Sequence, residues 1–328
     1  MPVAPLVLLE AGLIVAWSSG FVGARLAADA SSVFLVLFWR FVIVALLLAP
    51  LLWRAARQGL TVRSLLLQTL LGIFAMFGFL APGIKAIELG VPAGTAALIS
   101  ALQPLATAAL AGPLLHEQVD RRQWLGLALG LGGVLLAVSG ALGHAPLWAY
   151  GLSALSTASL VAATLLAKRV PDSTPLLPSL AIQSLATAIL FAPLALWDGG
   201  ILPDLDLGFA AAVAWFIVLS TIGGYGLYWL CLRRTTATRV GSLIYLTPPV
   251  TMIWAWAMFG EPLTLMSMTG FAICLIGVAF THGFGLRTRQ PPQEAPARQS
   301  SAGGTVRPPP APGAPRRSVP PCRGGAAG

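Results

Sequence analysis

Ten apolar stretches, each about 20 residues long, dominate this chain. A helix of about 20 apolar residues spans the hydrocarbon core of a bilayer. Because short polar or charged segments separate the stretches, the pattern predicts ten transmembrane helices. The expected spans are 6–28, 33–53, 64–87, 92–115, 123–142, 147–168, 176–197, 207–231, 240–259 and 263–284.

The composition supports a membrane protein and excludes the common soluble classes. Of the 328 residues, 57% are hydrophobic and only 9% are charged, whereas soluble domains carry about 25% charged residues. An ordinary soluble enzyme, a disordered protein or a secreted disulfide scaffold does not fit these values. The net charge of +9 falls mainly on an Arg-rich C-terminal segment without a recognition motif, so we expect no nucleic-acid partner.

The sequence contains no pattern that is typical of an enzyme or a metal site. Its three Cys and three His show no ligand spacing, so we expect neither a metal site nor a disulfide framework. A phosphate loop, a Ser-His-Asp set and a paired-carboxylate site are all missing. We therefore expect no enzymatic activity and no cofactor.

The basic residues predict the orientation in the membrane. With the N-terminus in the cytoplasm, 17 of the 20 Lys and Arg residues lie in cytoplasmic loops or in the C-terminal segment. The positive-inside rule favours this topology, which puts both termini in the cytoplasm. Residues 286–328 are rich in Pro, Gly and Arg and are expected to form a disordered basic tail. The tail is either passive or in electrostatic contact with anionic lipid.

The sequence repeats itself at an offset of 144 residues. The matched positions are Gln103-Pro104 with Thr247-Pro248, Glu117 with Glu261, Gly126 with Gly270, and Gly133-Val134 with Gly277-Val278. The repeat unit contains five helices, with expected domains at 1–142 and 143–285 before the tail. Because five is an odd number, the second copy enters the membrane upside down, as is typical of alternating-access transporters. We predict an all-α integral membrane protein with ten transmembrane helices in two inverted five-helix repeats.

Short motifs occur in a characteristic order along both halves. They are Trp17-Ser18-Ser19-Gly20-Phe21, Phe38-Trp39-Arg40-Phe41, Ala96 to Gln103-Pro104, Glu117 with Gln123-Trp124-Leu125-Gly126, Tyr245-Leu246-Thr247-Pro248 and Phe259-Gly260-Glu261-Pro262-Leu263-Thr264. In these motifs, over residues 6–284, the chain resembles the EamA-type ten-helix carriers of the drug/metabolite transporter superfamily. The resemblance implies a multi-pass carrier of the bacterial inner membrane, often an exporter of amino acids, related metabolites or toxic compounds.

Arg40 is the most informative charge within the predicted spans. A charged side chain inside a membrane usually faces a cavity or a partner, and the planar guanidinium suits two-point binding of a substrate carboxylate. A structural ion pair and a side chain that reaches outward to the interface are the alternatives. Gln183 occupies nearly the equivalent place in the second half, which predicts a polar pair facing one cavity.

Prolines interrupt two matched spans. Proline removes a backbone donor and clashes with the preceding turn, and transporters often interrupt helices at the substrate site. A kink that only improves packing is the alternative. The expected hinges are Pro82, Pro104, Pro248 and Pro249, and the expected substrate-binding residues beside the breaks are Gln103, Tyr245 and Thr247.

Trp17, Ser18 and Tyr225 are further candidates for substrate contact. The indole of Trp17 and the hydroxyl of Ser18 can line a pathway, although small residues also serve close helix packing. Tyr225 matches Ala81, which precedes Pro82, and its ring suits amphipathic substrates and cations. A place in an interfacial aromatic belt is the alternative for Tyr225.

Glu117, Glu261, Gly126 and Gly270 are expected to be structural. Each Glu follows a predicted span and is expected to cap the N-terminus of the next helix, with proton coupling as the alternative. Gly126 begins a GxxxG pattern that ends at Gly130, which favours close packing within the bundle or, alternatively, a dimer face.

These observations predict a secondary-active exporter of small metabolites, amino acids and related compounds first, that works by alternating access. Without a nucleotide-binding motif, its energy would come from a proton gradient or from the substrate's own gradient. A lipid-linked sugar or headgroup flippase and a multidrug exporter are the alternatives. The expected partners are a small-molecule substrate, protons and membrane lipid, and the expected assembly is a monomer, with a dimer as the alternative.

Overall fold

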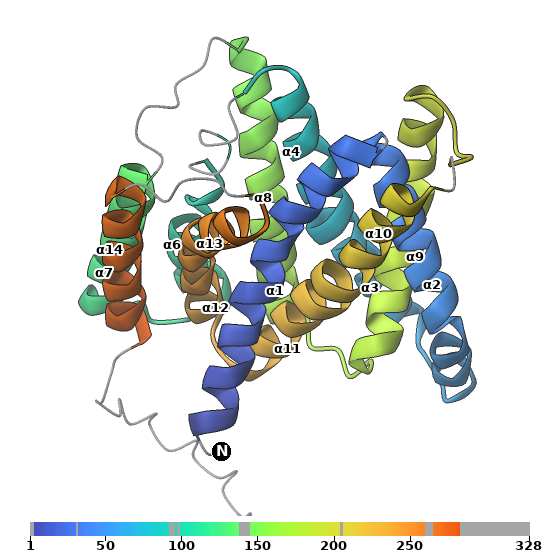
Figure 1. Cartoon of the computed structure of the whole chain (residues 1–328). Coiled ribbons are helices and arrows are strands. Elements are labelled where there is room, and N and C mark those ends of the chain that lie inside the picture. Colours follow the sequence, from blue (N-terminus) through green and yellow to red (C-terminus); the bar gives the residue numbers. More distant parts are fainter. Residues whose placement is uncertain are drawn as a thin grey trace, which may run out of the picture. The chain divides into compact units, whose positions relative to one another are not determined.

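The computed structural model describes residues 3–30, 32–91, 96, 99–137, 145–203, 206–259 and 265–282. Every regular element among these residues is helical (Figure 1). The expected tail at 286–328 and Glu261 lie outside the described residues.

Within the described residues, five helices are long and apolar enough to cross a membrane: Val33–Arg57, Val62–Glu88, Leu147–Arg169, Leu176–Trp197 and Leu207–Arg234. They consist of α2 (Val33–Arg57), α3 (Val62–Gly72) with η1 (Ile73–Phe77) and α4 (Gly78–Glu88), α8 (Leu147–Arg169), α9 (Leu176–Trp197), and α10 (Leu207–Trp215) with η2 (Phe216–Tyr225) and α11 (Gly226–Arg234). The remaining helices are α1 (Val3–Ala30), α6 (Gln103–Leu115), α7 (Arg121–Ala137), α12 (Ala237–Leu243), η3 (Ile244–Leu246), α13 (Thr247–Phe259) and α14 (Leu265–His282).

The expected span at 240–259 is divided in the structure. It consists of the short helix α12, the 3-10 turn η3 and the helix α13. Pro104 and Pro248 are the second residues of α6 and α13, so both lie in the first turn of a helix. The reason is that proline lacks a backbone N–H and has a fixed φ, which suits the first turn of a helix. Pro82, in contrast, lies inside α4.

Two of the long helices contain a π-helical segment at equivalent positions. With the offset of 144, residues 73–77 of η1 correspond to residues 217–221, which lie within η2. A π-helical turn disturbs the regular hydrogen bonding of the helix and frequently occurs at functional sites. Two carbonyl oxygens of η1 accept bonds from side chains: Phe74 O from Ser159 Oγ at 2.9 Å, and Ala75 O from the Tyr225 hydroxyl at 3.0 Å.

Helices α7 and α14 pack through glycines (Figure 1). A Cβ atom added at Gly126 would lie 2.5 Å from the Gly277 carbonyl oxygen, and one added at Gly277 would lie 2.6 Å from the Gly126 carbonyl oxygen. A Cβ atom added at Gly133 would lie 2.7 Å from the Gly270 carbonyl oxygen. Because the early glycine of each helix faces the late glycine of the other, the two helices run antiparallel. The offset of 144 relates Gly126 to Gly270 and Gly133 to Gly277, so both helices use the same glycines.

Several other helix pairs also join the two halves of the chain. Helix α2 packs against α9, α1 against η2, α4 against α8, and α6 against α12. Phe41 of α2 stacks on Phe191 of α9 with ring centroids 6.0 Å apart. The buried core is therefore built from both halves at once.

The glycine contact gives a first prediction. Gly133→Ala should lower the stability of the protein by about 1–3 kcal/mol, because its new methyl group would overlap backbone atoms of α14. Gly132→Ala is the matched control: nothing lies within 4 Å of its added Cβ, so alanine should stabilise the helix by about 0.5–1 kcal/mol. Melting temperatures of the purified variants in detergent measure both effects. Equal melting temperatures for the two variants would contradict the packing described here.

Candidate functional site

Four buried polar atoms that lack a partner in the described part of the chain belong to the early turns of α6 and to the segment in which η3 leads into α13. Within the described residues, Gln103 Nε2, Thr107 Oγ1, Tyr245 OH and Thr247 Oγ1 are buried and lack a hydrogen-bond partner. All four belong to α6, η3 or the first residue of α13. An unsatisfied buried polar group costs about 1–3 kcal/mol, so this arrangement is suited to a polar ligand or to water that satisfies these atoms.

Helix α1 is tied to the start of α13. The Ser18 hydroxyl donates to Thr247 O at 3.2 Å, and the Thr251 hydroxyl donates to Ser18 O at 3.5 Å. Trp17 directly precedes Ser18 in α1. Its ring centroid lies 5.2 Å from that of Tyr225 and 5.0 Å from that of Tyr228.

Tyr228 links this aromatic cluster to α6. Its hydroxyl is hydrogen-bonded to Thr164 of α8, and the Gln103 side chain lies beside it without a hydrogen bond from Nε2. The structure therefore brings together the predicted residues Trp17, Ser18, Gln103, Tyr225 and Thr247. Tyr228 joins this group although the sequence-based site omits it, as it omits the unpartnered Thr107 of α6. Helical spacing was the available signal, since Tyr228 lies three residues after Tyr225 and Thr107 four after Gln103.

Tyr245 belongs to η3 and packs against α7. A Cβ atom added at Gly130 of α7 would lie 2.4 Å from the Tyr245 ring. The ring therefore packs directly on the α7 backbone, and only glycine at position 130 leaves room for it. The position of its unpartnered hydroxyl depends on the contact between α7 and η3.

Arg40 is fully buried, with 0% of its surface exposed. Its Nε atom donates to Thr221 Oγ1 at 2.7 Å, and its Nη2 atom donates to Ser220 Oγ at 3.1 Å. The guanidinium also lies over the rings of Phe41 and Phe216, 4.6 and 4.8 Å from the centroids. Such burial excludes a side chain that reaches outward to the interface.

The charge of Arg40 faces hydroxyls and aromatic rings. Within the described part of the chain, Arg40 forms no ion pair, and its Nη1 atom has no hydrogen-bond partner. Thr221 in turn donates to Phe216 O, five residues earlier in the π-helical segment. Arg40 is thereby attached to η2, the segment that packs against α1.

Gln183 belongs to a different network from Arg40, so the expected polar pair facing one cavity is not formed. Gln183 Nε2 donates to Gln68 Oε1 at 2.7 Å, and Trp229 Nε1 donates to Gln183 Oε1 at 2.9 Å. Gln183 instead lines a cavity of about 390 Å³ between α3, α8, α9 and α11. Arg40 and Gln183, which are one residue short of the offset of 144, therefore carry different polar contacts.

Glu117 caps a helix that is distant in the sequence. Its carboxylate accepts hydrogen bonds from Ala237 N at 3.0 Å and from Thr238 N at 3.5 Å, at the N-terminus of α12. We expected Glu117 to cap the next helix, α7, but Asp120 holds that position together with Gln123 in a reciprocal capping box.

The backbone before Glu117 explains the difference. His116 ends α6 in the left-handed conformation, with φ of 56°. This conformation turns the chain sharply at the end of the helix. The turn brings the Glu117 carboxylate to α12, while Asp120 remains in place for the next helix.

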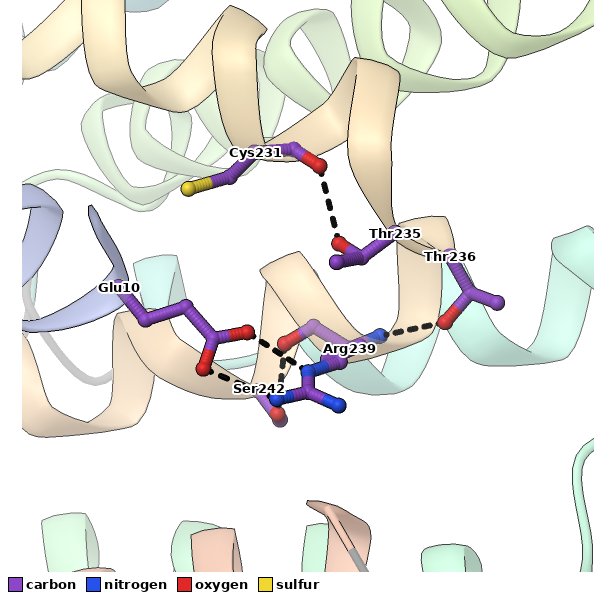
Figure 2. A network of polar contacts seen from close by, with 6 residues as sticks. All are labelled: Glu10, Cys231, Thr235, Thr236, Arg239 and Ser242. Carbon is purple, nitrogen blue, oxygen red and sulfur yellow. Dashed lines mark hydrogen bonds and ion pairs between the residues drawn. The ribbon is translucent and has the colours of Figure 1, made fainter. Parts of the chain in front are cut away.

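A second carboxylate from the first half also holds α12 (Figure 2). Glu10 of α1 forms a two-point ion pair with Arg239, at 2.6 Å to Nε and 3.0 Å to Nη2. Thr236 Oγ1 accepts a bond from Arg239 N, and the Ser242 hydroxyl donates to Arg239 O. Helix α12, which precedes the break at η3, is therefore fixed by Glu10 and Glu117 together.

Comparison with known proteins identifies the family. The model of the EamA-like transporter family matches residues 5–139 and again residues 147–282. The chain is 28% identical over 289 residues to a protein of Salmonella typhimurium named "Probable amino-acid metabolite efflux pump", covering 85% of this chain and 94% of that one. It is 29% identical over 283 residues to the "Probable terminal-alkyne amino-acid exporter" of Streptantibioticus cattleyicolor, covering 81% and 89%.

The fold is also found among solved structures. One crystal structure has a TM-score of 0.69 with 20% sequence identity, covering 84% of this chain and 96% of the other. At that identity the likeness concerns the fold alone. Because the family model matches both halves and most of the length, this chain belongs to the EamA-like transporter family.

Proposed function

We propose that this protein is a secondary-active exporter of small metabolites, with amino acids and related compounds as the first candidates. The observation that carries the proposal is the group of buried, unpartnered polar atoms at the start of α6 and at the break between α12 and α13. Two relatives named as an amino-acid metabolite efflux pump and an amino-acid exporter support this substrate class.

The proposed architecture is ten spans in two inverted repeats, with domains at 1–142 and 143–285 and both termini in the cytoplasm. The antiparallel glycine contact between α7 and α14 supports an inverted repeat over a parallel one. The matched π-helical segments η1 and η2 support the same offset of 144 residues. The distribution of Lys and Arg supports the orientation in the inner membrane.

In the proposed mechanism the substrate lies between α6 and α13. Gln103 and Thr247 supply unpartnered polar atoms to it, and Trp17 and Tyr228 supply an aromatic wall. Inverted repeats alternate access when one group of helices rocks against the other around a fixed site. Pro104 and Pro248 lie in the first turn of α6 and α13, where a missing N–H breaks no helical hydrogen bond, so these helix starts are where we expect the direction to change.

Removing the unpartnered groups tests this site. Gln103→Leu and Thr247→Val should each reduce export about tenfold, equivalent to a loss of roughly 1.4 kcal/mol of substrate interaction. Stability should be unchanged or higher, because these atoms lack a partner within the described residues. Export is measured as the amino acids that accumulate in the medium of overexpressing cells, normalised to membrane abundance.

The matched control is Ser184→Ala. This hydroxyl is equally buried and also lacks a partner in the described structure, but it belongs to α9, which packs against α2 and α3. Its removal should leave export unchanged. Full export by Gln103→Leu and Thr247→Val would contradict the proposed site, as would an equal loss in the control.

Arg40 gives a separate prediction for an anionic or zwitterionic substrate. Arg40→Gln should accumulate in the membrane, because it leaves hydroxyl groups without a donor but strands no carboxylate known from the described structure. Its export of carboxylate-bearing substrates should fall about tenfold or more, given the roughly 1.5–3 kcal/mol of a charged hydrogen bond. Arg40→Lys should rescue only part of the activity, since an ammonium cannot reproduce the planar fork. Normal abundance with normal export in Arg40→Gln would rule out a role for Arg40 in substrate recognition.

A further inference from the structure

The cavity between α3, α8, α9 and α11 carries charged groups that the proposed transport site does not use. Its volume of about 390 Å³ falls within the range of about 300–1,000 Å³ that small-molecule sites occupy. Lys168, Asp172 and Arg233 line it together with the buried side chains of Gln68, Gln183 and Trp229.

A chain of hydrogen bonds forms the wall of this cavity and has a fixed direction. Trp229 donates to Gln183, Gln183 donates to Gln68, and Gln68 Nε2 donates to Asp172 Oδ2 at 2.6 Å. An indole N–H can only donate and a carboxylate can only accept. Both ends of the chain therefore determine the orientation of the two amides, and the wall is held in one arrangement.

Asp172 remains a carboxylate, and several hydrogen bonds hold it in place. It accepts from Ser64 and Thr174 at Oδ1, at 2.8 and 3.0 Å, and from Gln68 at Oδ2. Partial burial raises the pKa of this carboxyl group, but the hydrogen bonds outweigh burial and hold the pKa below its usual value. An ionised carboxylate offers about four acceptor positions; of the side-chain bonds only that of Gln68 reaches Oδ2, and the Thr174 backbone also donates to the carboxylate.

The two cations of the cavity are not neutralised by Asp172 through direct bonds. Arg233 donates through Nη2 to Thr174 O and Ser179 Oγ, at 2.9 and 3.3 Å. Lys168 donates to Thr235 O. Two positive charges thus line a cavity whose lining includes the carboxylate of Asp172, while Glu117, outside this lining, lies near Lys168. Both of these Arg233 bonds use Nη2.

We propose that this cavity is a loading site for a zwitterionic metabolite of amino-acid size, with its carboxylate held by Arg233 and Lys168 and its ammonium held by Asp172. This inference rests on the proposed function. In the proposed topology the ends of α8 and α11 and the start of α9 face the cytoplasm, the side from which an exporter takes its substrate. The site is distinct from the unpartnered polar atoms at α6 and α13.

The test is equilibrium binding to the purified full-length protein in lipid nanodiscs. Each of the twenty standard amino acids is screened by thermal shift, because a ligand that binds the folded state raises the melting temperature. The best ligand is then titrated beside its analogue without the ammonium group and its analogue without the carboxylate. We expect the complete zwitterion to bind most tightly and the analogue without a carboxylate to bind most weakly.

Variants at one helix end provide the matched comparison. Arg233→Gln should raise the Kd of the best amino acid about tenfold, equivalent to about 1.4 kcal/mol. Arg234→Gln removes the same charge from the next residue of α11, which does not line the cavity, and should change the Kd less than twofold. Lys168→Gln, which leaves the bonds of Arg233 to the start of α9 intact, should also weaken binding.

Three results would overturn the loading site: no stabilisation by any amino acid, equal binding of the analogue without a carboxylate, or an unchanged Kd in both Arg233→Gln and Lys168→Gln. Gln103→Leu separates this inference from the proposed function, because it should lose export but keep binding that depends on Arg233. If export depends on Gln103 but no amino acid binds in a way that depends on Arg233, the proposed export function stands and the loading site is rejected. If binding depends on Arg233 but the protein exports no amino acid, the binding site remains and the proposed export function is rejected.

Discussion

The need to satisfy polar groups inside a hydrophobic environment governs this structure. Hydrocarbon offers no hydrogen bonds, so helices must satisfy their backbone internally or through side chains. The irregular segment η1 meets this need with hydroxyls of Ser159 and Tyr225 that come from other helices. The few atoms that remain unpartnered at α6 and α13 are notable against this background, and the functional proposal depends on them.

The sequence predicted much of the fold because apolar length and matched motifs are local signals. It predicted helices throughout and an interruption at Pro104 and Pro248. It did not predict that these prolines lie in the first turn of a helix, nor the π-helical segments, which are as apolar as the helices beside them. The bonds between Glu117 and α12 join residues about 120 positions apart, and only the three-dimensional packing determines such a pair.

Part of the candidate site was also predicted from the sequence. Trp17, Ser18, Gln103 and Thr247 were predicted from motifs and helix breaks, and they meet through contacts between α1, α6, α11 and α13. The partnership of Arg40 with Gln183 was predicted from the repeat and is not formed. The offset of 144 places Ser184, not Gln183, opposite Arg40. Arg40 bonds to η2, whereas Gln183 joins Gln68 and Trp229.

The inverted repeat is the central claim, and labelling from the two sides of the membrane tests it most directly. Gln58 and Leu202 are exposed and are related by the offset of 144 residues. Each is replaced by cysteine in a variant without Cys231, Cys274 and Cys322, and treated with a membrane-impermeant thiol reagent. The account predicts that intact cells label position 202 only and that inside-out vesicles label position 58 only. Labelling of both positions from the same side would contradict the inverted repeat.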